Sequence, residues 1–400
     1  MFLHQEERMM ESNVEKIIES YNNFYSEKPE IVASCGGRFE ILGNHTDHNH
    51  GLCIASACNL EITAAVKKRK DKMVSLKSLG FAINEIELTD LDIREEEKET
   101  SNGLIRGVAA YLLNNGYKIG GFNAYTISTV FKGAGVSSSA AFELLVGHIF
   151  NVLYNDGKIP RLVLCKAGQY AENNYFGKKS GLLDQIGVGY GGVVQIDFQD
   201  INNPVVEQVK FPFTNLHFLL INTGGDHSNL SDLYSSIPVD MYAAANEMKQ
   251  RFLRDATYEE LEEAKSALTE MQYLRAKHFY TENIRVRKAI QAIKNEDEKT
   301  FLQTINESRE SSTNNLKNMM VGTNYEGSPL EACDLLMKTT ENHGAVKING
   351  GGFAGSCIAV IPSEYLEKSL KVLKKKYGDE NVQEIFVRED GPKTIYNLGK

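Results

Sequence analysis

The sequence predicts a mixed α/β protein of two lobes, in which mixed sheets pack with helices (α+β type). Its 400 residues, 42% hydrophobic and 24% charged, are long for one compact domain and comfortable for two. The first half alternates strand-like and helix-like segments. Residues 240–318 are charge-rich and carry apolar residues three or four positions apart, which indicates a series of packed helices.

The expected elements follow from the spacing of apolar residues. Val14, Ile17, Ile18, Tyr21 and Tyr25 recur at helical intervals and predict an amphipathic helix over 11–26. Strands are predicted at 31–41, 52–66, 73–79, 122–130, 192–198 and 216–222, and helices at 103–115, 138–154 and 160–176. The last portion combines the segments AVKING and SCIAVIP, a helix near 363–377 and a strand at 383–388.

A polar connection containing Pro204 and Pro212 is the expected boundary between two domains, 1–205 and 206–400.

Composition and charge exclude several classes of protein. The net charge is −9 and both signs are interleaved, so neither nucleic acid nor an anionic membrane is an expected partner. No run of about 18 apolar residues occurs, and the acidic N-terminus does not resemble a signal peptide, so a cytoplasmic protein is expected. The six cysteines form no CxxC pair, which predicts small buried residues rather than disulfides or a zinc ribbon.

Glycine is concentrated in three segments of the chain. They are ASCGGRFEILGNHTDHNHG at 33–51, KGAGVSSSAA at 132–141 and KINGGGFAGSC at 347–357. Clustered glycines allow sharp turns and a close approach of backbone to a ligand. We therefore expect the functional site to lie where these loops meet.

The second glycine segment has the features of a phosphate-binding loop. Gly133 and Gly135 allow a tight turn, and Ser137, Ser138 and Ser139 then stand at the first turn of a predicted helix. Unpaired N–H groups and the positive end of the helix dipole meet there. A single serine would suffice to cap the helix, so three serines favour phosphate over simple N-capping. The segment matches neither GxxxxGK[ST] nor a dinucleotide fingerprint.

Taken together, the three segments resemble the three motifs of the GHMP kinase superfamily, and within it the galactokinase subfamily. GRFEILGNHTDHNHG is similar to the galactokinase signature, KGAGVSSSAA to the phosphate loop and INGGGFAGSC to the third motif. AENNYFGKKSGLLDQ at 171–185 resembles the segment with the catalytic aspartate. The resemblance covers roughly residues 28–400. It implies the two-lobed GHMP kinase fold with its active site in the cleft between the lobes, ATP and Mg2+ as cofactors, and a monomer or homodimer.

The resemblance also assigns expected roles to the phosphate-transfer residues. Asp184, expected in a loop after the 160–176 helix, would accept or orient the proton of the sugar hydroxyl, and Arg38 would stabilise charge near it. Ser139 and Glu172 would supply oxygen ligands to magnesium. The nucleotide-binding residues would be Gly133, Gly135, Ser137, Ser138 and Ser139.

The expected sugar site lies in the first and third motifs. By resemblance, His45 and Asp47 bond sugar hydroxyls, Asn44 faces the C6 hydroxyl, and Tyr234, Gly351 and Gly352 lie near the sugar. A transition-metal site built from the HTDHNH segment is the alternative. Its spacing matches neither HExxH nor a zinc finger, which favours the sugar.

Departures from the family pattern leave the substrate open. Asn44 stands where galactokinases usually have Glu, and His48 where they have Tyr. Ser101 and Leu104 occupy the region of the family's aromatic pair around adenine, and the chain has no Trp. The leading expectation is a galactokinase. The alternatives are a kinase for an N-acetylhexosamine or a pentose, and a non-catalytic sugar sensor. The four residues Arg38, Ser139, Glu172 and Asp184 argue against the sensor.

Overall fold

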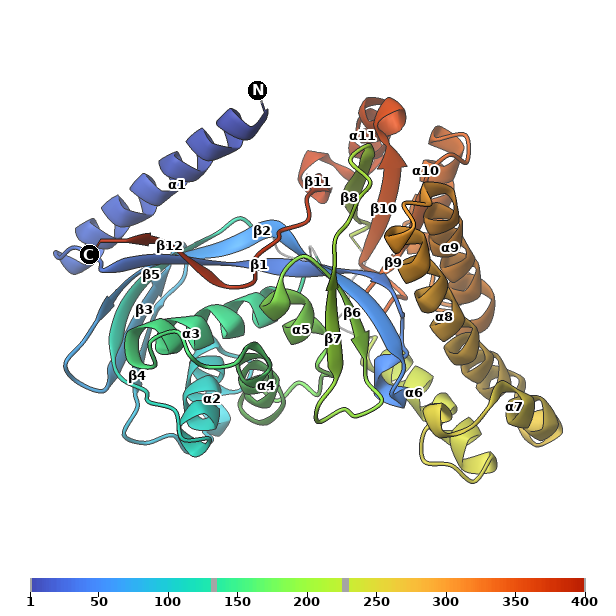
Figure 1. Ribbon diagram of the computed structural model, residues 1–400, viewed down its shortest axis with the longest axis horizontal. Helices are drawn as coiled ribbons and strands as arrows, with labels where there is room; N and C mark the ends of the chain where they lie inside the picture. Colours follow the sequence, from blue (N-terminus) through green and yellow to red (C-terminus); the bar gives the residue numbers. More distant parts are fainter. Residues whose placement is uncertain (1, 131–134, 225–229, 399–400) are drawn as a thin grey trace.

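The computed structural model describes residues 2–130, 135–224 and 230–398 (Figure 1). Its strands are β1 (Ile31–Leu42), β2 (Leu52–Lys68), β3 (Met73–Ser78), β4 (Ile83–Glu87), β5 (Phe122–Ser128), β6 (Val193–Asp197), β7 (Val205–Val209), β8 (Leu216–Asn222), β9 (Ala345–Asn349), β10 (Ser356–Pro362), β11 (Val382–Ile385) and β12 (Lys393–Asn397). Its α-helices are α1 (Phe2–Tyr25), α2 (Ser101–Asn114), α3 (Ser138–Tyr154), α4 (Arg161–Ala171), α5 (Leu183–Tyr190), α6 (Ser231–Glu247), α7 (Tyr258–Ala264), α8 (Glu270–Lys294), α9 (Glu298–Ser311), α10 (Pro329–Thr339) and α11 (Ser363–Tyr377). None of the helices in the described ranges combines the length and the apolar character needed to cross a bilayer.

The first sheet follows the order β12-β1-β2-β5-β3-β4, with β6 and β7 continuing from β2. Helices α2 to α5 lie on one face of this sheet and α1 on the other (Figure 1). Successive side chains of β1 point to opposite faces of this sheet. Ala33 and Cys35 belong to the core under α2 to α5, whereas Val32 packs beneath α1. Because helices cover both faces of the sheet, every residue of the strand is buried, including the charged Arg38 and Glu40.

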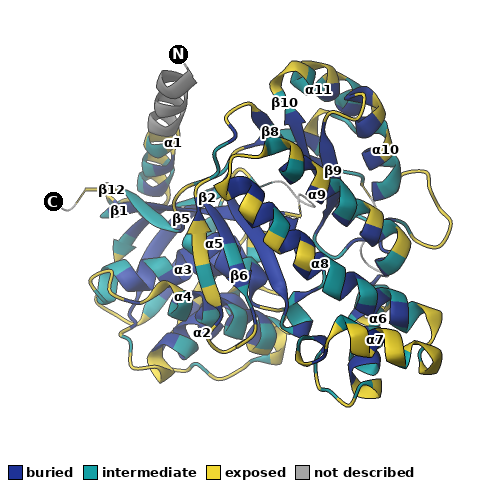
Figure 2. Cartoon of the chain, turned by 45° about the vertical axis from the view of Figure 1, so that its right-hand side comes forward, coloured by how far each residue is buried: buried dark blue, intermediate teal, exposed yellow. Residues whose placement is uncertain are grey.

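The second sheet has the order β11-β8-β10-β9. In β8, Phe218 and Leu220 pack with residues of α8 and α9, while Leu219 and Ile221 pack with residues of α10 and α11. The sheet is therefore a buried middle layer between two pairs of helices, and its strands are dark in the burial colouring of Figure 2. The apolar run FLLI within LHFLLIN is the sequence signature of this position.

The structure confirms the mixed α/β class and the helical nature of residues 240–318, which form α6 to α9. Strands β4, β7 and β12 were not expected from the sequence. The exposed residues of β4 and β7 interrupt any apolar alternation. Strand β12 is held by pairing with β1, more than 350 residues away in the chain, so its local sequence carries little information.

The predicted domain division at 205/206 falls inside the described strand β7, which pairs with β6 of the first sheet. The last strand, β12, also returns to the first sheet by pairing with β1. We therefore propose that the boundary lies after β7, near residue 210, and that the chain crosses back to the first lobe before β12.

All six cysteines are buried and free, as expected. The Sγ atoms of Cys333 and Cys357 are 3.8 Å apart, well beyond the length of a disulfide bond. The cysteines therefore serve as small core residues.

A buried ion pair joins the two lobes. Lys347 in β9 is fully buried, and its Nζ lies 2.8 Å from Oε1 of Glu40 in β1. The ammonium also donates to the carbonyl of Ile348 at 2.7 Å. Because a charge without a partner is costly in a protein interior, each member of this pair requires the other.

Replacing Lys347 by Met should lower the free energy of unfolding by about 3–5 kcal/mol, because Glu40 would keep its burial and lose its cation. Urea denaturation at pH 7 measures the change. Lys368→Met is the control, since the Lys368–Glu341 pair is 54% and 65% exposed and exposed pairs contribute up to about 1 kcal/mol. Equal small losses in both variants would contradict the importance of the buried pair.

Candidate active site

The three glycine segments meet around one cavity of about 420 Å³ between the lobes. Its lining includes Arg38, Gly135, Ser137, Ser138, Ser139, Lys178, Asp184, Tyr234, Asn349, Gly350, Gly351 and Gly352. The lining is mostly polar groups and glycine backbone, which suits a hydrophilic, charged ligand. Gly133, expected in the same loop, lies outside the described residues.

Arg38 and Asp184 form the centre of this cavity. The Nε of Arg38 in β1 donates to Oδ1 of Asp184 at 2.7 Å, and its Nη1 donates to the carbonyl of Gly135 at 2.8 Å. The hydroxyl of Ser137 donates to the other carboxylate oxygen, Oδ2. The expectation that Asp184 stands in a loop was wrong, because it lies in the first turn of α5. A helix holds the carboxylate more rigidly than a loop would.

These contacts set the charge of Asp184. Burial by itself would raise the pKa of this carboxyl, but the Arg38 guanidinium and the Ser137 hydroxyl outweigh burial and hold the pKa below its usual range. Asp184 is therefore ionised at neutral pH.

The serines of the second loop do not act as simple caps. Helix α3 begins at Ser138, as expected, but the side chain of its N-cap residue, Ser137, makes no capping bond and donates to Asp184 instead. Gly135 has a φ of +71°, and a Cβ there would overlap the Ser356 hydroxyl, so the turn requires glycine. The N–H groups of the first turn of α3 therefore lie beside the cavity and are not capped by the Ser137 side chain.

Glu172 lies at the junction of α4 with a π-helical turn (Glu172–Phe176) and is 1% exposed. Its Oε1 accepts from Ser139 Oγ at 3.0 Å and from Lys178 Nζ at 2.9 Å. Its Oε2 accepts from the Ser180 hydroxyl and from Gln185 Nε2. Lys178 already occupies the oxygen that Ser139 shares, so a divalent cation such as magnesium, which prefers oxygen ligands, would have to displace this ammonium to bind there.

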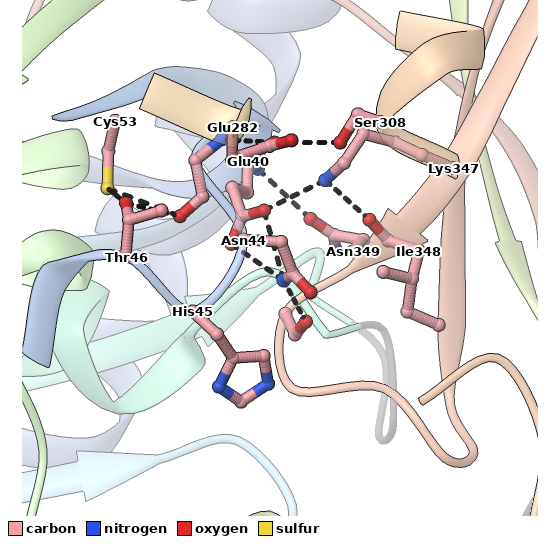
Figure 3. Close-up of polar contacts among 12 residues, drawn as sticks. Glu40, Asn44, His45, Thr46, Cys53, Glu282, Ser308, Lys347, Ile348 and Asn349 are labelled. Atoms are coloured by element: carbon pink, nitrogen blue, oxygen red, sulfur yellow. Dashed lines mark hydrogen bonds and ion pairs between the residues drawn. The ribbon is translucent and has the colours of Figure 1, made fainter. Parts of the chain in front are cut away.

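Asn44 and His45 hold the third glycine loop, and the hydrogen bonds of Asn44 are drawn in Figure 3. Asn44 is 1% exposed, and its amide donates to the Gly350 carbonyl at 2.7 Å and to Glu40 at 3.2 Å. His45 Nε2 lies 2.9 Å from the Gly351 carbonyl. Since a carbonyl only accepts, we assign the proton to Nε2, which leaves Nδ1 as an acceptor. Burial lowers the pKa of His45, so the ring is neutral.

Asp47 lies against the segment that leads to Asp184. A Cβ at Gly181 would stand 2.5 Å from Asp47 Oδ2. Burial raises the pKa of Asp47 to about 6, and the charges of Glu40 and Asp184 act in the same direction. The described residues contain no group of three or more His, Cys, Asp or Glu side chains placed to hold a metal, so the HTDHNH segment is not organised as a transition-metal centre.

Tyr234 completes one wall of the cavity. A Cβ at Gly351 would lie 2.6 Å from its ring, so the absence of a side chain lets the ring lie on the loop. Gly352 has a φ of +89° and packs on Asn318. The three residues come together as the sequence predicts.

The predicted site residues thus fall into two groups. Arg38, Asp184, Tyr234 and the described loop residues line the cavity together. The predicted residues that are not among its described lining residues are Asn44, His45, Asp47 and Glu172. Sequence reasoning missed Lys178 and Asn349, which also line the cavity. The position of Lys178, midway between Glu172 and Asp184 in the chain, was a signal that was available.

Comparison with known proteins identifies the class. Residues 103–192 match the family model of the GHMP kinases N terminal domain, and residues 19–68 match the galactokinase galactose-binding signature. By these two matches the chain is similar to the GHMP kinase superfamily and, within it, to the galactokinases, which are sugar phosphotransferases.

Relatives and solved structures agree with this placement. The galactokinases of Fusobacterium nucleatum subsp. nucleatum and Enterococcus faecalis are each 28% identical, over 92% of this chain and 95% and 94% of those proteins. The structure of Lactococcus lactis galactokinase complexed with galactose has a TM-score of 0.81 at 23% identity, covering 95% of this chain and 99% of that one. A mevalonate kinase structure has a TM-score of 0.64 at 16% identity, covering 90% of this chain and 100% of that one.

Proposed function

We propose that the protein is an ATP-dependent galactokinase, which transfers the γ-phosphoryl group of ATP to the C1 hydroxyl of galactose and yields galactose 1-phosphate and ADP. The observation that carries this proposal is the Arg38–Asp184 pair. It stands where the phosphate loop meets the strand of the galactose-binding signature, with Arg38 bonded to both Asp184 and Gly135. Similarity to galactokinases over nine-tenths of the chain supports it.

In this proposal Asp184 orients the attacking hydroxyl and takes its proton. Its low pKa makes it a weak base, so the proton moves as the bond to phosphorus forms and the hydroxyl becomes more acidic. Arg38 holds the carboxylate and places a fixed positive charge beside the reacting oxygen. No covalent enzyme intermediate is needed, since transfer is direct.

The phosphate loop binds the nucleotide through the N–H groups at the start of α3 and the residues Ser137, Ser138 and Ser139. Ser139 and Glu172 would hold magnesium, whose contribution when bound is to neutralise phosphate charge. Gly135 keeps the turn of this loop tight, because a side chain there would overlap the Ser356 hydroxyl.

The sugar is held, in this proposal, by Asp47, by the Nδ1 acceptor of His45, and by Tyr234 with Gly351 and Gly352. Asn44 places an amide instead of a carboxylate at the position expected to face C6, and that amide already donates to Gly350 and Glu40, so charge at this residue does not select for that hydroxyl. Discrimination between sugars then depends on hydroxyls that bond to Asp47.

The proposal includes a cytoplasmic location and a monomer or homodimer. Positive and negative charges are interleaved along the chain, which argues against a nucleic acid or membrane partner. The polar cavity suits a sugar and ATP as the partners.

A coupled ADP-release assay with MgATP and a panel of sugars tests the proposed activity. Galactose should give the highest kcat/KM, ahead of N-acetylgalactosamine, arabinose and glucose. A higher value for another sugar would replace galactose as the substrate. Tight binding of sugar and nucleotide without turnover of any sugar would instead indicate a non-catalytic sensor.

Asp184→Asn should lower kcat by about 10²–10⁴-fold, because the amide cannot accept the hydroxyl proton, while ADP affinity stays within about twofold. Steady-state kinetics and calorimetric titration measure the two quantities. Asp240→Asn is a matched control, since Asp240 pairs with Arg275 at 2.6 Å with exposures of 22% and 7%, against 25% and 8% for Asp184 and Arg38. Full activity of Asp184→Asn would overturn the assignment.

Galactose affinity should strengthen as the pH rises through about 6, because only the ionised Asp47 accepts two hydroxyls and its pKa is raised to about 6. Between pH 7 and pH 5 the dissociation constant, measured by calorimetry without nucleotide, should increase about tenfold. Asp47→Asn should bind weakly with a flat profile over this range. An unchanged pH profile in that variant would assign the titration to another group.

A further inference from the structure

Lys178 is a cation in the cavity that the proposed mechanism leaves without a role. It lies in the loop between the π-helical turn and α5, and it lines the same cavity as Ser137, Ser138 and Ser139. Its side chain is 57% exposed, while its partner Glu172 is 1% exposed. The lysine therefore reaches from the open cavity to a buried carboxylate.

The hydrogen bonds of this cluster leave donors of Lys178 unused. An ammonium carries three donors, and among the described residues its acceptor is Glu172 Oε1 at 2.9 Å. Glu172 in turn accepts four hydrogen bonds, from Ser139, Lys178, Ser180 and Gln185, so its lone pairs are occupied. The remaining donors of Lys178 must find their acceptors in water or in a ligand within the cavity.

Arg38 is the more constrained cation of the cavity. Two of its five donors bind protein groups, Nε to Asp184 and Nη1 to the Gly135 carbonyl, and these bonds fix the position of the guanidinium. Lys178 is the more adaptable cation, because a flexible four-carbon chain carries its compact charge. Lys178 and Ser139 both donate to Oε1 of Glu172. When a cation binds at that oxygen, Lys178 can move away from it and donate all three of its N–H groups to an anion.

We propose that Lys178 is a nucleotide-binding residue whose ammonium donates directly to a phosphate oxygen of ATP and ADP. The assignment rests on the proposed kinase function, because it takes the anion in this cavity to be a nucleotide phosphate. A lysine ammonium is a suitable point charge for phosphate, and the neighbouring Ser137, Ser138 and Ser139 fix the phosphates within its reach.

Calorimetric titration with ADP tests the proposal, in EDTA and again with Mg2+. Lys178→Met should weaken ADP binding about 10- to 100-fold in both conditions, the range expected for a lost hydrogen bond to a charged group. Lys178→Arg should recover most of the affinity, since it keeps the charge. Galactose affinity should not change in either variant, which reports an intact fold.

Lys179→Met is the matched control. Lys179 is the adjacent exposed lysine and is not among the described lining residues, so its removal changes the net charge by the same amount without removing the contact. Its ADP affinity should stay within twofold of the unmodified protein. Equal ADP affinities of Lys178→Met and Lys179→Met would overturn the proposal.

Two other outcomes also overturn it. A loss confined to Mg2+ conditions would mean that Lys178 acts by positioning Glu172, and equal losses for ADP and galactose would mean that it supports the fold. If the unmodified protein phosphorylates galactose and Lys178→Met binds ADP normally, only the role of Lys178 fails. If the unmodified protein binds no ADP, the kinase function fails with it.

Discussion

The pairing of buried, ionised carboxylates with cations organises this molecule. Glu40, Glu172 and Glu282 are each at most 4% exposed, and water cannot compensate such charges. Each pair also fixes a part of the site. Glu282 accepts from the backbone N–H of Gly43 at 3.0 Å, and although burial alone would raise its pKa, Arg285 outweighs burial and the pKa falls to about 2. The three pairs are Glu40–Lys347, Glu172–Lys178 and Glu282–Arg285.

Strand β1 carries two of the charged residues that shape the functional site. Arg38 and Glu40 are two residues apart on it, and they reach α5 and β9 respectively, so one strand holds both walls of the cavity. Glu143 shows the opposite solution to burial. Its pKa is raised well above the usual range, mainly by burial and then by Glu172, so it is neutral, and Gln185 donates to both carboxyl groups. A protonated acid and a paired carboxylate thus stand side by side without repulsion.

The sequence predicted the fold class and most elements, because these depend on local spacing. The resemblance to a family located part of the cavity lining, and it missed Lys178 and Asn349. Apolar periodicity located β8 and the helices of 240–318, and clustered glycines located three turns with close backbone approach. Asp184 was misplaced in a loop because α5, in whose first turn it lies, contains two glycines in eight residues, and this helix is stabilised by packing on β1 and β2. Ser137 resembled a helix cap, and only the proximity of Asp184 redirected its hydroxyl.

The amino-acid sequence alone determined which chemical groups are present, the three loops that carry them and the kinase family that they define. It also contained Asn44 and Lys178, but not what either of them contacts. Tertiary structure decided that Arg38 meets Asp184 across 146 positions of the chain, and that Lys347 meets Glu40 across 307. The physical reason is that turn and helix preferences act between near neighbours in the chain, whereas the strength of an ion pair depends on distance and burial in space.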